Sequence, residues 1–447
     1  MPFPQSFLDE LMARSDIVDV VGSYVQLTRK GANLFGLCPF HSEKTGSFSV
    51  SPDKQIYYCF GCKRGGGVIN FIMEEENLSF PDAVRFLAKR AGMEVPEEDG
   101  DREAGRRRQR LLDLNRDAAR FYYQMLQQPE GRAVQEYLDR RKIRRATAVN
   151  FGLGASLDAW DALILAMTKK GYTKSELLEA GLAVQNRNGG LYDKFRNRLI
   201  FPVIDVRGDV VAFGGRVLDK SEPKYMNSQE TPVYSKRRVL YGLNLAKKSK
   251  RSNIILCEGN IDVVTLHQAG FDNAVASMGT ALTVEQTRLL SRFTKELVLC
   301  YDNDNAGKIA TERALEILNN SEFSVKVLQL PRRRTEDGKL VKQDADDFIK
   351  LQGKDAFEAL LTGSENGIEF RMAQAAGKYD LSSDEARVAY CEEVSALLAA
   401  LANPVEREIY TTRAAETAKI TPEAMRLEVQ RAFKRRLSRE KRQELRR

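Results

Sequence analysis

Two groups of side chains with metal-binding chemistry stand out in this sequence. The first consists of three cysteines and one of the chain's two histidines. Cys38 and His41 are separated by two residues, and Cys59 and Cys62 repeat that spacing further along the chain. Two such knuckles bring thiolate and imidazole ligands together in a tetrahedron around Zn²⁺. Because the protein fills all four positions, the spacing predicts a single, structural zinc ion.

Two other uses of these residues are weaker. A CxxC redox site would need a strand–helix junction around Cys59 and Cys62, and the Cys38–His41 knuckle argues against it. Four unrelated buried side chains are the other alternative. Disulfides are not expected, because the N-terminus lacks a secretory signal and no run of 18 apolar residues could span a membrane. We therefore expect a cytoplasmic protein with reduced thiols.

The second group consists of carboxylates that follow apolar strands. Glu258 comes directly after residues 254–257, and Asp302 and Asp304 come shortly after residues 297–300. The carboxyl ends of parallel strands meet at one edge of a sheet, where clustered acids repel one another unless Mg²⁺ or Mn²⁺ neutralises them. Two such ions can activate a 3′-hydroxyl and stabilise a leaving pyrophosphate. We therefore expect these three residues to hold about two Mg²⁺ ions.

Three further acids are expected to support that metal site and to share in catalysis: Asp262, Asp344 and Asp346. A calcium-binding EF-hand is one alternative for the run that begins at the second acidic group. Its fifth and twelfth positions would be Ala306 and Arg313, neither of which suits calcium. Helix capping is the other alternative, and it would explain one acidic cluster but not two.

Apolar patterning indicates which elements carry these residues. Short strands at 48–50 and 56–58 read as a hairpin between the zinc knuckles. Further along, strands alternate with helices in the way that is typical of a parallel sheet covered by helices. The expected elements are helices at about 7–17, 81–91, 111–126, 261–269 and 307–318, strands at 199–204, 210–213, 254–257, 297–300 and 325–328, and a helical region from about 356 onward.

Composition adds a weaker constraint. Apolar residues make up 43% and charged residues 30% of the 447 residues, which is ordinary for a globular protein. Lys and Arg outnumber Asp and Glu by 70 to 62, for a net charge of +8. This excess permits a polyanionic partner, although solvated surface charge explains it equally well.

The motifs resemble a known family. The run from Phe35 to Val50 resembles the zinc-finger signature of bacterial DNA primases. The two acidic groups, with residues 277–281 between them, resemble the Toprim domain that these primases share with type IA topoisomerases and some nucleases. The resemblance implies that the ribbon engages a single-stranded template. Its aromatic and basic residues suit base stacking and phosphate contacts, or alternatively ribbon core and solvated charge: Phe48, Tyr57, Tyr58, Lys44, Lys54, Lys63 and Arg64.

A basic strip distinguishes primases from other Toprim proteins. The runs 214–218, 223–228 and 230–243 resemble the primase core just upstream of its Toprim domain. Positions that contact template or nucleotide phosphates in the family are matched here by Arg216, Lys224, Tyr225 and Lys236. Lys194, Arg196 and Arg198 extend the strip. Cations facing a metal cluster suit triphosphate binding, although each could also be a solvated surface charge.

The expected fold class is multidomain α+β and α/β. We expect a zinc-ribbon template-binding domain over 1–98, a linker over 99–109, the basic N-terminal part of an RNA polymerase core over 110–251, a Toprim domain over 252–350, and a helical subdomain with a basic tail over 351–447. The helicase-binding domain usual at the C-terminus of the family is expected to be absent, so recruitment by the replicative helicase stays open.

The expected function is that of a DNA primase, an RNA polymerase that makes short primers from ribonucleoside triphosphates on single-stranded DNA at the replication fork. Two alternatives remain. A Toprim nuclease or topoisomerase would share the acidic groups. A non-catalytic, zinc-dependent single-stranded DNA-binding module would share the ribbon, but it would not need clustered carboxylates that repel DNA.

Overall fold

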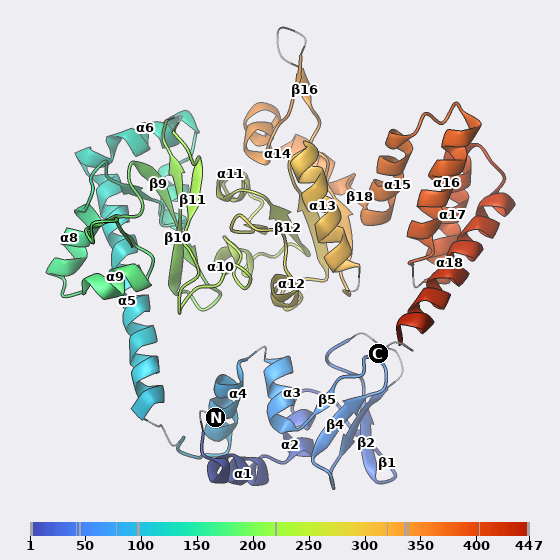
Figure 1. Cartoon of the computed structure of the whole chain (residues 1–447), viewed down its shortest axis with the longest axis horizontal. Helices are drawn as coiled ribbons and strands as arrows, with labels where there is room; N and C mark the ends of the chain where they lie inside the picture. Colours follow the sequence, from blue (N-terminus) through green and yellow to red (C-terminus); the bar gives the residue numbers. More distant parts are fainter. Residues whose placement is uncertain are drawn as a thin grey trace. The chain divides into compact units, whose positions relative to one another are not determined.

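The computed structural model describes residues 3–41, 43, 46–76, 78–95, 99–219, 221–319, 321–334, 337, 339–401 and 403–444 (Figure 1). Contacts within the chain divide it into two compact units. The first comprises Met1–Ser252, Cys257–Lys295 and Glu316–Phe323. The second comprises Asn253–Leu256, Glu296–Leu315 and Ser324–Arg447.

The N-terminal region combines a five-stranded antiparallel sheet, in the order β1-β2-β3-β4-β5, with four helices. Its elements are α1 (Gln5–Arg14), α2 (Ile17–Gly22), β1 (Thr28–Lys30), β2 (Asn33–Gly36), β3 (Phe48–Ser51), β4 (Ile56–Cys59), β5 (Gly65–Gly66), α3 (Val68–Glu75) and α4 (Phe80–Arg90). The expected first helix is two helices, because Asp16 accepts hydrogen bonds from Val18 and Asp19 and so caps the start of α2.

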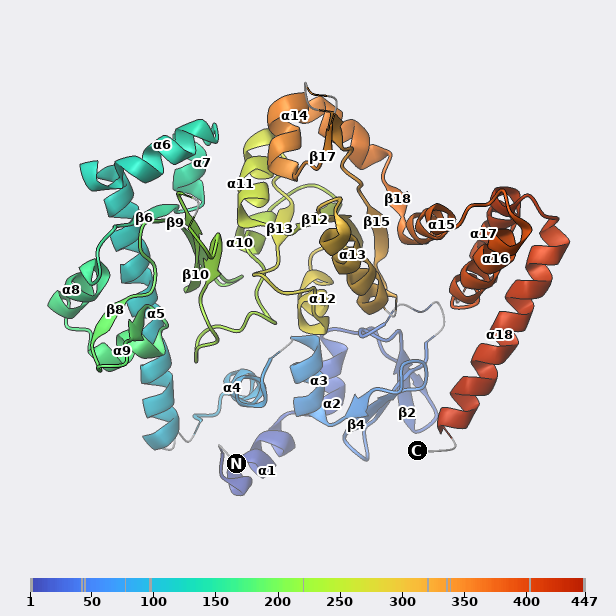
Figure 2. The same ribbon diagram turned by 45° about the horizontal axis from the view of Figure 1, so that its top comes forward.

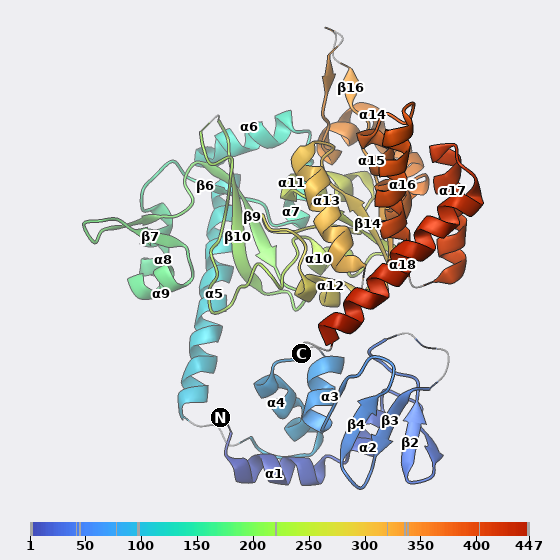
Figure 3. The ribbon, with the colours of Figure 1, turned by 45° about the vertical axis from the view of Figure 1, so that its right-hand side comes forward.

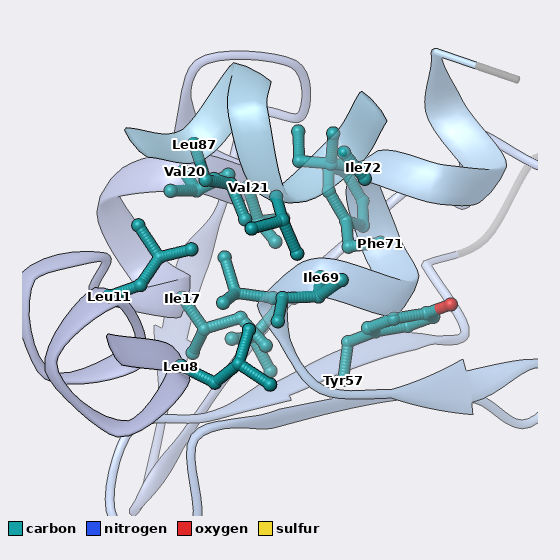
Figure 4. Close-up of a cluster of buried hydrophobic side chains, with 14 of the residues drawn as sticks. Leu8, Leu11, Ile17, Val20, Val21, Tyr57, Ile69, Phe71, Ile72 and Leu87 are labelled. Atoms are coloured by element: carbon teal, nitrogen blue, oxygen red, sulfur yellow. The ribbon is translucent and has the colours of Figure 1, made fainter. Parts of the chain in front are cut away.

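Apolar side chains from all four helices and the sheet form one core (Figure 4). Leu11 and Ile17 are fully buried, and so is Phe71 of α3. The ring of Phe71 meets the edge of Tyr57 at 5.5 Å between centroids. Each large side chain removed from water in this way contributes about 1.5–3 kcal/mol. The core therefore holds β3 and β4, and the zinc knuckles at their ends, against the helices.

The middle of the chain builds a four-stranded antiparallel sheet in the order β11-β10-β9-β6, with α5 packed against β6 and β10 (Figure 1). Its elements are α5 (Asp99–Gln127), the 3-10 turn η1 (Pro129–Gly131), α6 (Arg132–Arg140), α7 (Arg145–Asn150), β6 (Gly154–Ser156), α8 (Ala162–Lys169), α9 (Lys174–Glu179), β7 (Ala183–Gln185), β8 (Leu191–Asp193), β9 (Arg198–Ile204), β10 (Val210–Val217), β11 (Tyr225–Asn227) and α10 (Leu243–Ala246). The same unit contains α11 (Asn260–Ala269), β13 (Ala274–Ala276) and α12 (Val284–Leu290).

Residues 99–109, expected as a linker, form the first turns of α5. Polar contacts there replace the apolar face that the sequence lacks. Arg107 pairs with Glu179 at 2.8 Å, and Arg110 pairs with Glu176 at the same distance, so both join α5 to α9. The assignment of this range as a connection between domains stays a prediction.

One buried carboxylate fixes a helix of this region. Asp193, at the end of β8, is 3% exposed and accepts hydrogen bonds from the backbone N–H groups of Leu163, at 2.7 Å, and Ile164, at 3.0 Å. It therefore serves as the N-terminal acceptor of α8 from a distant strand. Burial outweighs these hydrogen bonds and raises the pKa of Asp193 to about 6.

The second unit contains a sheet whose strands follow the order β12-β14-β15-β18. β14 and β15 run parallel, and the short β18 is antiparallel to β15. Figure 2 shows α13 lying along one face of this sheet. The elements are β12 (Asn253–Cys257), β14 (Glu296–Cys300), α13 (Asn305–Leu318), β15 (Ser324–Val327), β16 (Arg333–Arg334), β17 (Leu340–Val341), α14 (Ala345–Thr362) and β18 (Glu365–Asn366).

The C-terminal region is helical, as expected (Figure 3). It contains α15 (Gly367–Lys378), α16 (Asp384–Leu398), α17 (Pro404–Ala418) and α18 (Pro422–Glu444). These helices share a core of their own that includes Tyr390, Val394 and Met425, all fully buried. With the ribbon, the antiparallel sheet and the parallel strands, this region confirms the predicted multidomain fold class.

Candidate functional site

The four predicted zinc ligands lie together. The ligand atoms of Cys38, His41, Cys59 and Cys62 are all within 4.8 Å of one another. The Sγ atoms of Cys38 and Cys62 are 3.9 Å apart, and Cys59 Sγ is 3.7 Å from Nδ1 of His41. Zinc bonds of about 2.3 Å to sulfur and about 2.0 Å to nitrogen place tetrahedral ligands roughly 3.6–3.8 Å apart. The residues present therefore fit a zinc ion and are too far apart for a disulfide.

A carboxylate stands behind the histidine ligand. Glu43 Oε2 is 3.3 Å from His41 Nε2, the ring nitrogen that does not face the thiols. The other oxygen, Oε1, accepts from the backbone N–H groups of Cys38 and Ser47, each at 2.9 Å. Burial opposes the charge on Glu43, but hydrogen bonds from Ser47 and Cys38 outweigh it and lower its pKa. An ionised Glu43 holds the imidazole in the tautomer that presents Nδ1 to the metal.

Two small residues complete this surrounding shell. The Ser47 hydroxyl hydrogen-bonds Glu43, lies 3.3 Å from Cys59 Sγ and accepts from the Gly61 N–H at 3.2 Å. A Cβ atom at Gly61 would lie 2.6 Å from His41 Nε2 and 2.9 Å from Ser47 Oγ. Glycine is therefore required for the second knuckle to pass this close to the histidine. The sequence offered no separate signal for these roles, because they depend on how the two knuckles approach.

The aromatic residues of the ribbon divide between its core and its surface. Phe48 is fully buried and Tyr57 is 1% exposed, and their rings stack at 5.3 Å. Of the two roles considered for these rings, the structure gives them the second, because they form the ribbon core. Tyr58, 38% exposed, and Phe60, 58% exposed, meet edge to face on the surface. Lys44 lies outside the described residues.

In the second unit, Asp302 and Asp304 follow β14, in the loop that leads into α13. Lys342 lies between them: its Nζ is 2.7 Å from Asp304 Oδ2 and 3.4 Å from Asp302 Oδ2. Asp304 also accepts from the N–H of Gly307 at 2.8 Å. The hydrogen bond from Lys342 and that from Gly307 lower the pKa of Asp304, so its carboxylate is ionised near neutral pH. Two oxygens that share one cation are a suitable pair of ligands for a divalent metal.

The third acidic cluster lies close to Asp302, but two of its carboxylates already have structural contacts. The ligand oxygens of Asp344, Asp346 and Asp347 lie within 4.8 Å of one another. Asp344 caps α14 by accepting from the Asp347 N–H at 2.7 Å, and the fully buried Asp346 pairs with Lys350 at 2.5 Å. Burial raises the pKa of Asp344, and so do the neighbouring carboxylates, Asp302 among them. The field of Asp302 therefore reaches this cluster, whose structural roles do not require a metal.

Glu258 and Asp262 belong to the first unit, at the start of α11. Glu258 is exposed, directly after β12, and Asp262 is 6% exposed in the first turn of the helix. A Cβ atom at Gly259 would lie 2.7 Å from Asp262 Oδ2, so the carboxylate folds back over the residue that follows Glu258. The end of β12, Gly259 and the first turn of α11 therefore set the positions of Glu258 and Asp262.

Part of the basic strip forms a compact cluster beside Asp262. Arg216 of β10 is 6% exposed and lies opposite Tyr225 of β11. Its guanidinium hydrogen-bonds the Tyr225 hydroxyl and lies 5.0 Å from that ring and 5.5 Å from the ring of Tyr137. Burial raises the pKa of Tyr225; Arg216 opposes this rise, and Asp262 adds to it. The guanidinium of Arg216 therefore lies against two aromatic rings, an arrangement typical of a cation–π contact.

The other cations of the basic strip differ in their exposure and in what they contact. Arg198 is 6% exposed and donates to the Pro223 carbonyl at 2.9 Å, so it supports the loop before β11. Arg196 lies over the ring of Trp160 at 4.1 Å. Burial lowers the pKa of Lys194, and so does the charge of nearby Lys236. Lys224 is exposed. The positive charges of Lys194 and Lys236 therefore act on each other.

Comparison with known families gives four consecutive matches. The family descriptions are "CHC2 zinc finger" over residues 3–103, "DNA primase catalytic core, N-terminal domain" over 121–247, "Toprim-like" over 255–349 and "DnaB-helicase binding domain of primase" over 368–423. The order of the first three is the one expected from the ribbon, the basic strip and the acidic groups.

Individual proteins that are similar to this chain are also primases. A DNA primase of Clostridium acetobutylicum is 41% identical over 94% of this chain and 69% of its own length. A solved structure of the zinc-binding and RNA polymerase domains of the Aquifex aeolicus primase covers 94% of this chain and 98% of its own, with a TM-score of 0.58 and 31% identity. A DnaG primase catalytic domain bound to single-stranded DNA covers 70% of this chain and 99% of its own, with a TM-score of 0.60 and 32% identity.

The chain therefore belongs to the bacterial DNA primase family. It is accordingly a nucleotidyltransferase, a DNA-directed RNA polymerase, as predicted, and this reading is favoured over the Toprim nuclease, the topoisomerase and the non-catalytic DNA-binding module.

Two further findings concern partners and membranes. The expectation that a helicase-binding domain is absent was wrong, because residues 368–423 match one. The error arose because helices rich in Ala, Glu and Arg carry no short motif, and their identity lies in a pattern spread over the whole segment. Among the described residues, no helix is long and apolar enough to cross a membrane.

Proposed function

We propose that this primase makes RNA primers on single-stranded DNA with a metal site formed by Glu258, Asp302 and Asp304. The observation that carries this proposal is the cation-holding pair of Asp302 and Asp304, whose oxygens already share the ammonium of Lys342. Glu258, which follows a strand directly and is exposed, is proposed as a third oxygen ligand. When bound, about two Mg²⁺ ions, or Mn²⁺, supply charge neutralisation at the attacking and leaving oxygens of nucleotidyl transfer.

Two kinds of side chain support this site. Asp344 and Asp346 make the electrostatic potential at the site more negative, and they fix the start of α14. Asp344 caps the helix, and Asp346 pairs with Lys350. Asp262 holds a negative charge near Tyr225 and Arg216. Their part in the reaction is therefore to orient ligands and cations rather than to react themselves.

The basic strip supplies the substrate contacts. Lys194 and Lys236 offer two adjacent cations to a triphosphate, and Arg216 holds a permanent charge close to Asp262. Lys224 is exposed next to Tyr225 and is available to a template phosphate. Arg196, stacked on the exposed Trp160, adds a cation to the same strip, while Arg198 supports the loop that carries Lys224.

The ribbon is proposed to bind the template, with its zinc ion in a purely structural role. If all four protein ligands hold a zinc ion, no open position would remain for water or substrate, so the ion would serve the fold alone. Tyr58 and Phe60 are the exposed rings that could stack on bases. The solved relative with bound single-stranded DNA supports the choice of template. Residues 368–423 are proposed to contact the replicative helicase at the replication fork.

The decisive experiment is a primer assay with single-stranded template, Mg²⁺ and labelled ribonucleotides. We expect Asp302→Asn to lower primer synthesis by about 100-fold or more, because it removes a charged metal ligand, while binding of single-stranded DNA persists. Asp355→Asn is the matched control, since it changes an exposed aspartate on α14. Normal synthesis by Asp302→Asn would contradict the proposed mechanism.

The same assay separates the proposed activity from the alternatives. Degradation of labelled DNA with Mg²⁺ and without nucleotides would indicate a nuclease. Tight DNA binding without product in any metal would indicate a binding module. A zinc analysis tests the ribbon independently: Cys59→Ser should reduce the zinc content below one ion per chain, and an unchanged content would show that the ligand set is wrong.

A further inference from the structure

Lys342 occupies the place where a metal ion would be expected. Its ammonium bridges Oδ2 of Asp304, at 2.7 Å, and Oδ2 of Asp302, at 3.4 Å. These are the two residues proposed above as metal ligands. A lysine that contacts both oxygens provides one positive charge where a divalent ion would provide two.

The position of Lys342 is set by the hairpin of β16 and β17, which precedes α14 and projects beside it (Figure 3). The base of this hairpin is fixed on both sides. Gln343, 2% exposed, donates to the Pro331 carbonyl at 2.7 Å. Asn303, which stands between the two acids, donates to the Leu330 carbonyl at 3.2 Å. The hairpin therefore holds the backbone of Lys342 next to the acidic loop.

The two sides of the ion pair differ in their freedom to move. Asp304 is fixed by a second hydrogen bond from Gly307, and its side chain is 34% exposed. The Lys342 side chain is 57% exposed, and it ends in a compact, strongly hydrated ammonium on a flexible stem. When a cation of higher charge arrives, the lysine can swing into water while the carboxylates stay in place.

We propose that Lys342 is an internal counterion that a divalent metal must displace from Asp302 and Asp304. The lysine neutralises the acidic loop in the free enzyme and weakens metal binding there. This inference rests on the proposed assignment of Asp302 and Asp304 as metal ligands. It makes Lys342 a regulator of metal loading, with no contact to the reacting atoms implied.

The test measures binding of Mn²⁺ to the zinc-loaded full chain without nucleotides, followed by the paramagnetic resonance signal of free Mn²⁺. We expect Lys342→Met to lower the dissociation constant about fivefold, which corresponds to the upper range for an exposed ion pair. Lys342→Arg, which keeps the charge, should stay within about twofold of the unsubstituted protein. Metal-free Lys342→Met should also melt at a lower temperature and gain more from added Mg²⁺ than the unsubstituted protein, because its carboxylates lack their counterion.

The control is Lys326→Met, which removes a lysine paired with Glu296 at 3.3 Å at the opposite end of β14. It should leave Mn²⁺ affinity unchanged. An unchanged or weaker affinity in Lys342→Met, with normal melting behaviour, would overturn the role of the lysine. Asp304→Asn separates the two proposals. If it weakens Mn²⁺ binding while Lys342→Met has no effect, only the counterion is refuted, whereas unchanged binding in Asp304→Asn refutes both.

Discussion

Replacing Glu43 by glutamine should loosen the zinc site without touching a ligand. The carboxylate serves four donors with two oxygens: the N–H groups of Cys38 and Ser47, the Ser47 hydroxyl and Nε2 of His41. A glutamine has one acceptor oxygen. If that oxygen keeps the two backbone N–H groups, the amide nitrogen faces the N–H of His41, and two donors oppose each other.

The expected magnitude follows from what the histidine loses. Its side chain is 25% exposed and that of Glu43 only 10%, so water replaces the lost acceptor poorly. Loss of such an outer partner typically weakens metal binding about 10- to 100-fold, which is about 1.4–2.7 kcal/mol. The assay is a competition for zinc between the purified protein and a coloured chelator, from which the dissociation constant is read directly.

Glu10→Gln is the matched control, because Glu10 is a half-exposed glutamate of the same region that pairs with its helix neighbour Arg14. It should leave zinc affinity unchanged. Equal affinities in Glu43→Gln and Glu10→Gln would refute the idea that Glu43 orients His41. The reasoning would then have to assign the hydrogen bonds of Glu43 to the fold of the knuckle alone.

Two further predictions concern single positions. Gly61→Ala should weaken zinc binding about tenfold or more, because its Cβ would lie 2.6 Å from His41 Nε2. Gly22→Ala is the control and should leave zinc binding unchanged, because the space around Gly22 is open. Equal zinc affinities in the two variants would contradict the packing argument. Asp193→Asn should lower the free energy of unfolding at pH 7 by about 1–3 kcal/mol, because one N–H of α8 loses its acceptor. Since the pKa of Asp193 is raised to about 6, the folded protein binds this proton more tightly than the unfolded chain. The advantage over Asp193→Asn should therefore grow as pH falls from 7 to 5, and urea unfolding that shows a constant difference would contradict it.

Short local patterns gave the most reliable predictions from the sequence. The zinc ligands were predictable because each knuckle is a short run whose spacing alone fixes the geometry, as with Cys59 and Cys62. The strands before Glu258 and Asp302 were predictable because buried parallel strands are continuous apolar runs. In both cases the information lies within a few neighbouring residues.

Features that depend on distant contacts were missed. The first turns of α5 are polar because Arg107 and Arg110 face the glutamates of α9, about 70 residues away in the chain. Lys342 is separated by about 40 residues from the acids that it bridges. For Phe48 and Tyr57 the sequence left core and surface roles open, because their burial depends on α3 packing over the ribbon. Nothing in the residues next to these positions indicates such partners.

The closed base of the β16–β17 hairpin has a practical consequence. Because Gln343 and Asn303 hold the strand ends on either side, an insertion into this hairpin should cost the acidic loop little. Each doubling of a flexible loop adds only about 0.6 kcal/mol of closure entropy. This hairpin is therefore a suitable place to insert an affinity tag or a fluorescent reporter whose signal would follow the state of the neighbouring acids.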